Sequence, residues 1–318
     1  MNKKKYLYQK NNINSSKIIP INIVGNKKKK YKLKKPYWIK NKLPINNKLI
    51  NKIKKIINKY NLNSVCKEAS CPNLYECFNS GTVSFMILGN LCTRNCPFCN
   101  VNHGRPIYKN YKEPFNLAKA IKEMKLKYVV ITSVNRDDLR DGGSKHFVKC
   151  IKIIRKTNVK IKIEILVPDF KNCINIALNT INLHTPDIFN HNIENVPRLY
   201  KKIRPGANYF TSLNLLEKFK FFNPNIQTKS GLMIGLGETI SEIFKVMTDL
   251  INCGVNMITI GQYLQPTSNH LPVKKYISLK EFEYIKNEAL KMGFSNVYCG
   301  PFVRSSYHAD LQSKNLLN

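Results

Sequence analysis

Two short cysteine clusters are the part of the sequence with the clearest potential for chemistry. Residues 92–99 read CTRNCPFC, so three thiols at CxxxCxxC spacing lie on one short loop. Such a loop can wrap three thiolates around three corners of a cubane [4Fe–4S] cluster, which leaves the fourth iron without a protein ligand. That open iron could chelate a small molecule through an amine and a carboxylate together. The spacing therefore indicates a cluster that binds and activates a small ligand.

Zinc and disulfide bonds are the alternatives for these thiols. Structural zinc usually takes four protein ligands, often as two CxxC pairs, and residues 92–99 have no second pair close by. Disulfides are typical of exported chains, whereas the start, MNKKKYLYQKNN, lacks the apolar core of a secretory signal. Ten cysteines in a long chain of this kind favour metal ligands or catalytic thiols.

A second triplet, Cys66, Cys71 and Cys77, precedes the first at CxxxxCxxxxxC spacing. Three further thiolates indicate a second cluster, again one protein ligand short. Near the other end of the chain, residues 304–307 read RSSY. A serine oxygen is a harder and weaker ligand than a thiolate, so an iron held by serine could leave and expose bridging sulfides to attack. The plainer alternatives are that Ser306 bonds a backbone group and that Arg304 is a surface cation.

The rest of the chain must position these clusters, and its short apolar runs alternate with helical segments. The runs predict strands at 83–88, 128–132, 161–167, 187–191, 226–235 and 257–261. Helical spacing predicts helices near 48–60, 117–124, 147–154, 197–203, 241–253 and 278–292. Thr239 with Glu242, and Ser278 with Glu281, predict capping boxes at the last two helices.

This alternation is typical of parallel βα units. It predicts the α/β class, as a partial (β/α)6 TIM-like barrel with N-terminal and C-terminal extensions; doubly wound packing is the alternative. Sites in such barrels gather at the C-terminal ends of strands, and the CxxxCxxC loop directly follows the first strand. We expect a basic, mobile tail at 1–40, an extension with the first triplet at 41–82, the barrel at 83–270, and an extension with RSSY at 271–318.

The CxxxCxxC loop after the first strand of a partial barrel resembles the radical S-adenosylmethionine superfamily, and Phe98 also matches that pattern. The resemblance implies that Cys92, Cys96 and Cys99 hold a [4Fe–4S] cluster whose open iron binds S-adenosylmethionine. It further implies that one electron from the cluster cleaves the sulfonium and yields a 5′-deoxyadenosyl radical. The cluster and the cofactor would then together supply a radical, which general acid–base side chains cannot generate.

Both triplets together with RSSYHAD resemble the lipoyl synthase family, from about residue 38 to about residue 313. The resemblance implies that Cys66, Cys71, Cys77 and Ser306 bind an auxiliary [4Fe–4S] cluster, with Ser305 as the close alternative to Ser306. It implies a sulfurtransferase that inserts two sulfur atoms at C6 and C8 of a protein-bound octanoyl chain, with the auxiliary cluster as the sulfur donor.

The same resemblance implies the partners. They are the octanoylated lipoyl carrier domains of 2-oxoacid dehydrogenase complexes, the glycine cleavage H protein, a ferredoxin or flavodoxin reductant, and iron–sulfur carrier proteins. Nucleic acid and membranes are not expected as partners. One rival hypothesis is a radical enzyme that methylthiolates tRNA, although no appended RNA-binding domain is visible. The other rival is a zinc-stabilised nucleic-acid binder without catalytic activity.

Six further positions are predicted to contact S-adenosylmethionine or the substrate: Asn135, Asp137, Asn192, Arg204, Gly235 and Glu238. The first two follow the second predicted strand, and Asn192 ends the fourth, where a barrel mouth would be. Arg204 could meet a carboxylate. The glycine-rich run around Gly235 lets a ligand approach the backbone, and a tight strand-to-helix turn is its alternative explanation. Each of these residues could instead be a satisfied structural polar group.

The net charge of +34 is spread rather than focused. Residues 1–60 hold nineteen lysines and no acidic residue, and the remaining excess follows a general preference for lysine. This favours a generally basic surface over a shaped nucleic-acid groove, and it is compatible with an acidic protein partner. No apolar run approaches the roughly 18 residues that span a bilayer, so we expect a cytoplasmic protein.

Overall fold

The computed structural model describes residues 33–39, 48–68, 71, 73, 77, 83–106 and 110–307. The chain divides into two units, Met1–Lys32 and Leu33–Asn318, and all of the described residues belong to the second. Most of the predicted tail at 1–40 lies outside the described residues, so the predicted part boundaries stay predictions. Within the described ranges, every helix is too short or too polar to span a lipid bilayer.

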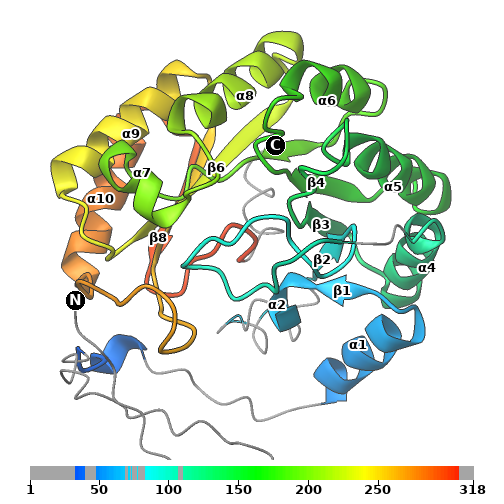
Figure 1. The fold of residues 1–318 in the computed structure, drawn as a ribbon, viewed down its shortest axis with the longest axis horizontal. Coiled ribbons are helices and arrows are strands. Elements are labelled where there is room, and N and C mark those ends of the chain that lie inside the picture. The colour runs from blue at the N-terminus through cyan, green and yellow to red at the C-terminus, as the bar shows by residue number, and fades with distance from the viewer. Residues whose placement is uncertain are drawn as a thin grey trace, which may run out of the picture. The chain divides into compact units, whose positions relative to one another are not determined.

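One eight-stranded sheet forms the centre of the described chain (Figure 1). Its strands are β1 (Asn63–Ser64), β2 (Ser84–Ile87), β3 (Tyr128–Ser133), β4 (Lys162–Leu166), β5 (Ile188–Asn190), β6 (Gln227–Ile234), β7 (Met257–Gln262) and β8 (Asn296–Gly300). They follow one another in chain order; β1 pairs antiparallel with β2, and all later neighbours pair in parallel. A doubly wound sheet would reverse its strand order. The predicted partial barrel is therefore confirmed.

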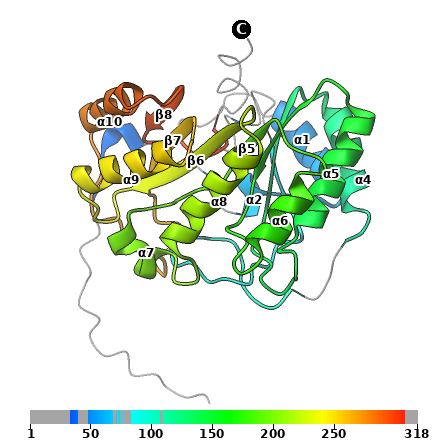
Figure 2. The same cartoon turned by 90° about the horizontal axis from the view of Figure 1, so that it is seen from above.

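Helices follow most strands and cover the outer face of the sheet (Figure 1; Figure 2 gives the view from above). They are α1 (Lys48–Lys59), α2 (Val65–Glu68), α4 (Glu113–Met124), α5 (Ser144–Thr157), α6 (Ile174–Ile181), α7 (Pro197–Ile203), α8 (Tyr209–Phe222), α9 (Ile240–Asn252) and α10 (Leu279–Lys291), with a 3-10 turn, η1 (Tyr37–Ile39). Both predicted capping boxes are present, at the starts of α9 and α10. All six predicted strands and six predicted helices are found.

Six elements were not predicted: the short η1, β1 and α2 before the barrel, and α6, α8 and β8 within it. Helix α8 carries exposed Phe210, Phe221 and Phe222 as well as buried apolar residues, so it lacks the one-sided stripe that marks a helix in sequence. Strand β8 lies inside the predicted C-terminal extension, yet it pairs in parallel with β7 and extends the barrel sheet by one strand.

A buried ion pair crosses the barrel interior. The Lys229 ammonium on β6 lies 3.2 Å and 3.3 Å from the two carboxylate oxygens of Glu164 on β4, and neither side chain is exposed. The Tyr128 hydroxyl and the Asn190 amide donate to the same carboxylate. Burial lowers the pKa of Lys229, and the Glu164 carboxylate opposes that shift. Because each charge is satisfied only by its partners, the pair holds β4 and β6 together below the site.

Replacing Lys229 by methionine should lower the free energy of unfolding by about 3–5 kcal/mol, because it leaves a buried carboxylate without its counter-charge. The matched control is Lys291→Met, which removes an exposed ammonium that lies 2.7 Å from Glu288 and should cost under about 1 kcal/mol. Thermal unfolding followed by circular dichroism compares the two. Equal shifts would contradict a supporting role for the buried pair.

Candidate functional site

A cavity of about 230 Å³ opens where β2, β3, β4 and β5 end. The three cysteines of the CxxxCxxC loop line it, as the barrel rule for strand ends predicts. Polar and charged lining comes from Arg94, Asn95, Thr132, Ser133, Asn135, His191, Asn192, Glu194 and Arg204, and apolar lining from Val65, Met86, Phe98, Val101, Val134, Leu166, Val167 and Pro168. The structure therefore brings Cys92, Cys96, Cys99, Asn135, Asn192 and Arg204 together, as the sequence predicts.

The cysteine loop is shaped by its own backbone. The Cys99 amide donates to the Cys96 carbonyl at 2.9 Å, and the Cys92 amide donates to the Asn102 carbonyl at 2.9 Å. The Cys92 sulfur accepts from the Arg94 amide at 3.4 Å and from the Asn135 side chain at 3.7 Å. These bonds turn the loop around the cavity wall.

The thiols of this loop need a cation to become thiolates. Burial raises the pKa of Cys96 to about 11 and that of Cys99 to about 12, so iron must displace their protons. Among the described residues, no three His, Cys, Asp or Glu side chains converge closely enough to hold one metal ion. A cubane separates its ligands further, because each thiolate binds a different iron. Three thiols on one loop, each able to bind a different iron, are the donor set that a cubane with one open iron requires.

Arg94 ties this loop to the ends of two strands. Its Nε and Nη2 donate to the two Asp137 oxygens at 2.7 Å each, and its Nη1 and Nη2 donate to the two Asp169 oxygens at 2.7 Å and 2.6 Å. Burial pushes the pKa of Asp169 up, but its contacts with Arg94 outweigh burial and hold that pKa below its ordinary value. Asp137 follows β3 and Asp169 follows β4. One guanidinium therefore fixes the loop against both strands.

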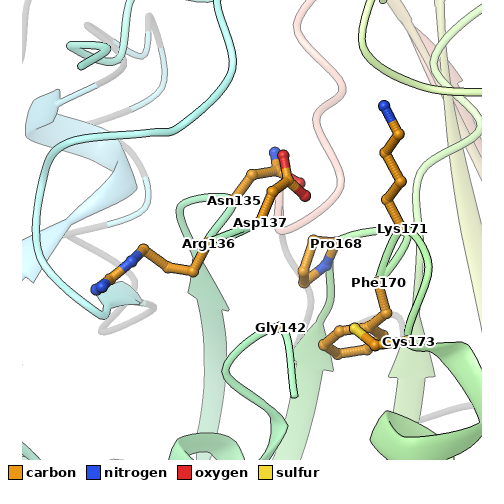
Figure 3. A pocket seen from close by; sticks show the side chains of 8 residues that line it. All are labelled: Asn135, Arg136, Asp137, Gly142, Pro168, Phe170, Lys171 and Cys173. Atoms are coloured by element: carbon orange, nitrogen blue, oxygen red, sulfur yellow. The ribbon is translucent and has the colours of Figure 1, made fainter. Parts of the chain in front are cut away.

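This arrangement bears on Asp137, which was predicted to contact the cofactor. Both of its carboxylate oxygens are bonded to Arg94. Asp137 also lines a second, small pocket with Asn135, Pro168 and Phe170 (Figure 3). The geometry is that of a loop support, and contact between Asp137 and the cofactor stays a prediction.

Three buried polar atoms in the cavity wall have no hydrogen-bond partner among the described residues: Ser133 Oγ, Asn135 Oδ1 and His191 Nε2. His191 Nδ1 lies 2.8 Å from the Val167 carbonyl, which fixes the proton on Nδ1. Burial lowers the pKa of His191 to about 4, so its free Nε2 is a neutral acceptor. Buried polar atoms of this kind require partners. The wall fits a ligand that offers amine and hydroxyl donors, as S-adenosylmethionine does.

Arg204 adds a cation to the same wall. Its Nη1 donates to the Asn192 carbonyl at 3.1 Å and to the Tyr200 hydroxyl at 2.8 Å, and its Nη2 lies 3.9 Å from Asp169. The half-buried Glu194 carboxyl also lines the cavity, and desolvation raises its pKa. A carboxylate entering here would meet the Arg204 guanidinium, and that contact stays a prediction.

The first cysteine triplet lies beside the C-terminal RSSY segment, although more than 220 residues separate them. Cys66 and Cys77 are buried, and Cys71 is half-buried. Burial raises the pKa of Cys66 to about 12, and the positive charge of Arg304 partly offsets the effect of burial on Cys71. The Asn73 side chain donates to the Phe302 carbonyl. These contacts place Cys71 near Arg304 and Asn73 beside Phe302, and an auxiliary cluster held by Cys66, Cys71, Cys77 and Ser306 stays a prediction.

Gly235 and Glu238 lie in the turn that joins β6 to α9. The Glu238 carboxylate accepts from the amides of Gly235 and Leu236. Gly235 has a φ of 100°, and a Cβ there would lie 2.1 Å from the Gln262 amide nitrogen. Neither residue is among those that line the cavity. The geometry matches the strand-to-helix turn that was the alternative, so cofactor contact at these two positions stays a prediction.

Sequence reasoning missed Arg94 and Asp169 as site residues, and it included Ser133 and His191 only as members of the polar segments 132–138 and 190–194 at strand ends. Asp169 follows β4, so the strand-end rule could have found it. Arg94 lies between two cysteines of the loop, but nothing in the sequence indicates that two distant carboxylates converge on it.

Known proteins resemble the chain in both sequence and fold. The family model described as "Radical SAM superfamily" matches residues 86–250. The protein named "Lipoyl synthase" from Wigglesworthia glossinidia brevipalpis is 61% identical over 307 residues, which cover 96% of this chain and 97% of that relative. A protein of the same name from Buchnera aphidicola subsp. Schizaphis graminum is 58% identical over 324 residues, which cover 100% of this chain and 99% of that relative.

Solved structures share the fold. Streptococcus suis SuiB bound to S-adenosylmethionine superposes with a TM-score of 0.52 at 11% identity, over 72% of this chain and 53% of that one. The FeFe-hydrogenase maturase HydG from Carboxydothermus hydrogenoformans superposes with a TM-score of 0.51 at 15% identity, over 79% of this chain and 62% of that one.

Proposed function

The chain belongs to the lipoyl synthase family of the radical S-adenosylmethionine superfamily, and from that premise we propose a role for each residue of its site. Members of this family are radical sulfurtransferases that use S-adenosylmethionine and [4Fe–4S] clusters. The observation that carries the proposal is the shared cavity. Its wall contains the cysteines of the CxxxCxxC loop and also Val65, the neighbour of Cys66. The CxxxCxxC loop thus borders the space in which a substrate would react, and Val65 brings the start of the first triplet close to the same wall.

Cys92, Cys96 and Cys99 hold the radical cluster, which supplies an electron and, with S-adenosylmethionine, a carbon radical. The protein itself binds and orients that cofactor. Arg204 supports its carboxylate, while Ser133, Asn135 and His191 offer acceptors to its amine and hydroxyl groups. Asn192, Gly235, Glu238 and Asp137 remain candidates for further contacts.

Cys66, Cys71, Cys77 and Ser306 hold the auxiliary cluster, the source of both sulfur atoms. The hydroxyl of Ser305 donates to Asn192 Oδ1 at 2.8 Å, so Ser305 is already engaged. This contact supports Ser306 over Ser305 as the ligand. A serine oxygen binds iron more weakly than a thiolate, which suits a cluster that must give up its sulfur.

The substrate is an octanoyl chain on a carrier lysine, thiolated at C6 and C8. Its saturated C–H bonds have no acidic proton, so acid–base groups cannot activate them. The side chains of Val65, Met86, Phe98 and Val101 give the cavity an apolar wall. That wall suits a hydrocarbon chain, orients it towards the radical, and excludes water from the reaction.

The carriers are lipoyl domains of 2-oxoacid dehydrogenase complexes and the glycine cleavage H protein. A ferredoxin or flavodoxin supplies electrons, and iron–sulfur carrier proteins rebuild the auxiliary cluster. The ten cysteines, all among the described residues, form no disulfide, and thiols persist in a reducing compartment; the cytoplasm is the location. Radical chemistry at two clusters leaves no role for zinc in nucleic-acid binding, and RSSY beside the first triplet does not fit a tRNA methylthiolating enzyme.

The test combines metal analysis with mass spectrometry of an octanoylated carrier peptide. Anaerobically reconstituted protein should hold about eight irons with matching sulfide, because each of two cubanes contains four. Incubation with S-adenosylmethionine and a reductant should produce the dithiolane mass. Protein that never holds more than one cubane has no sulfur donor, and that result would overturn the proposal.

Carrier binding should weaken as salt rises, because a chain with a net charge of +34 attracts an acidic carrier domain. We expect the Kd to rise about tenfold between roughly 0.05 M and 0.5 M NaCl, over which screening becomes strong. Isothermal calorimetry with an octanoylated carrier domain measures it. Sucrose at matched osmolarity serves as the control, and a Kd that ignores salt would exclude charge as the cause.

A further inference from the structure

The C-terminal segment 303–305 packs directly onto two neighbouring strands at their glycines. A Cβ at Gly261 on β7 would lie 2.0 Å from the Val303 carbonyl oxygen, and a Cβ at Gly231 on β6 would lie 3.1 Å from Ser305 Oγ. Only glycine lets a backbone come this close. The two glycines therefore form a cradle that places this segment at the barrel mouth.

Ser305 links the cradled segment to the cavity wall. Its hydroxyl donates to Asn192 Oδ1 at 2.8 Å. Asn192 is itself held, because its Nδ2 lies 3.1 Å from Glu194 Oε1 and its carbonyl accepts from Arg204 at 3.1 Å. All three of these partners line the cavity. Ser305 thus bonds to a preorganised group rather than to a mobile one.

We propose that the Ser305–Asn192 bond is a latch that keeps Ser306 on the iron of the auxiliary cluster. This inference rests on the proposed function, in which Ser306 is the fourth ligand. Ser305 is a positioning residue, since it acts through its neighbour. A weak oxygen ligand stays bound only if the chain presents it in place. Here the turn from Arg304 to Tyr307, closed by an amide-to-carbonyl bond of 2.9 Å, and the Asn192 contact supply that placement.

The latch also explains why the chain has two serines in a row. In the proposal, the Ser306 oxygen dissociates from the iron when the auxiliary cluster gives up sulfur. Ser305 sets how readily that dissociation occurs. Breaking one hydrogen bond of this kind changes an equilibrium by up to about tenfold. The latch therefore slows the loss of iron before turnover without making the cluster inert.

The test measures release of iron to a colorimetric chelator, without S-adenosylmethionine or reductant. The full chain carries alanine at Cys92, Cys96 and Cys99, so the auxiliary cluster is the only source of iron. In this background Ser305→Ala should release the first iron about five- to tenfold faster than the parent. Ser305→Thr keeps the hydroxyl and should restore slow release. Ser295→Ala is the matched control, because it removes an exposed serine bond to the Asn256 carbonyl and should change nothing.

Gly231→Ala tests the latch from the other side. Its new Cβ would lie 2.5 Å from Asn192 Oδ1, so it should displace the acceptor and speed iron release while Ser305 is intact. The iron content of the isolated Ser305→Ala protein must still match the parent. A cluster already lacking one iron, as expected for Ser306→Ala, would make Ser305 the ligand and overturn the latch.

The remaining outcomes separate the latch from the function on which it rests. If the parent holds its auxiliary cluster and Ser305→Ala releases iron at the parental rate, the latch is wrong and the proposed function stands. If the background chain assembles no auxiliary cluster although it is folded by circular dichroism, the proposed function falls, and the latch falls with it.

Discussion

Replacing Cys96 by alanine should abolish cleavage of S-adenosylmethionine, whereas replacing Cys66 should preserve cleavage and abolish only the thiolated product. Cys96 lines the cavity within the CxxxCxxC loop, and three thiolates are the minimum that hold a cubane with one open iron. Cys66 lies in α2, outside that loop, and its carbonyl accepts from the Cys71 amide at 3.1 Å. Loss of the auxiliary cluster therefore removes the sulfur source but not the radical source.

Two readouts separate these roles: 5′-deoxyadenosine by liquid chromatography, and the mass of an octanoylated carrier peptide. In Cys66→Ala 5′-deoxyadenosine should still form, and the peptide should gain no sulfur. The control is Cys253→Ala, which removes a half-buried thiol after α9 and should leave both products unchanged. Equal loss of 5′-deoxyadenosine in the Cys66 and Cys96 variants would show that the two triplets do not have separate functions.

The parts of this fold that sequence could predict are those set by local pattern. The capping boxes at Thr239 and Ser278 are readable because a hydroxyl and a glutamate three residues later satisfy the first amides of a helix. The strands are readable because buried parallel strands are continuous apolar runs. Helix α8 was missed because Phe210, Phe221 and Phe222 are apolar but exposed. Its sequence therefore does not show apolar residues on one face alone.

The parts that sequence could not predict depend on contacts between distant residues. Asp169 is presented by a loop in which Phe170 and Asn172 have φ values of 45° and 65°, and such left-handed residues follow from tertiary packing rather than local preference. Phe170 packs where a Cβ at Gly142 would lie 2.7 Å from its ring. The auxiliary site has the same character, since Asn73 meets Phe302 only once the barrel has formed.

The planar Arg94 guanidinium, here called the fork, bonds Asp137 and Asp169, which are distant from it in sequence. Weakening these bonds should have a measurable effect on the reaction. Arg94→Lys keeps the charge but replaces a planar fork with a single ammonium, which cannot bond four carboxylate oxygens on two loops. The cysteine loop would then no longer be held in a fixed position relative to the ends of β3 and β4. A displacement of about 1 Å at a reacting centre can cost about 100-fold in rate. We expect that loss in cleavage of S-adenosylmethionine.

The control for the fork is Arg198→Lys, since Arg198 forms a bidentate pair with Glu242 at 2.7 Å and 3.0 Å on an exposed surface. It should retain full cleavage. Asp169→Asn should reproduce the Arg94→Lys defect from the partner's side, because it leaves the buried guanidinium undercompensated. Iron content should stay near that of the unmutated protein, while the electron paramagnetic resonance spectrum of the reduced cluster with S-adenosylmethionine should change. If Arg94→Lys cleaves at the original rate with an unaltered spectrum, the fork does not position the loop.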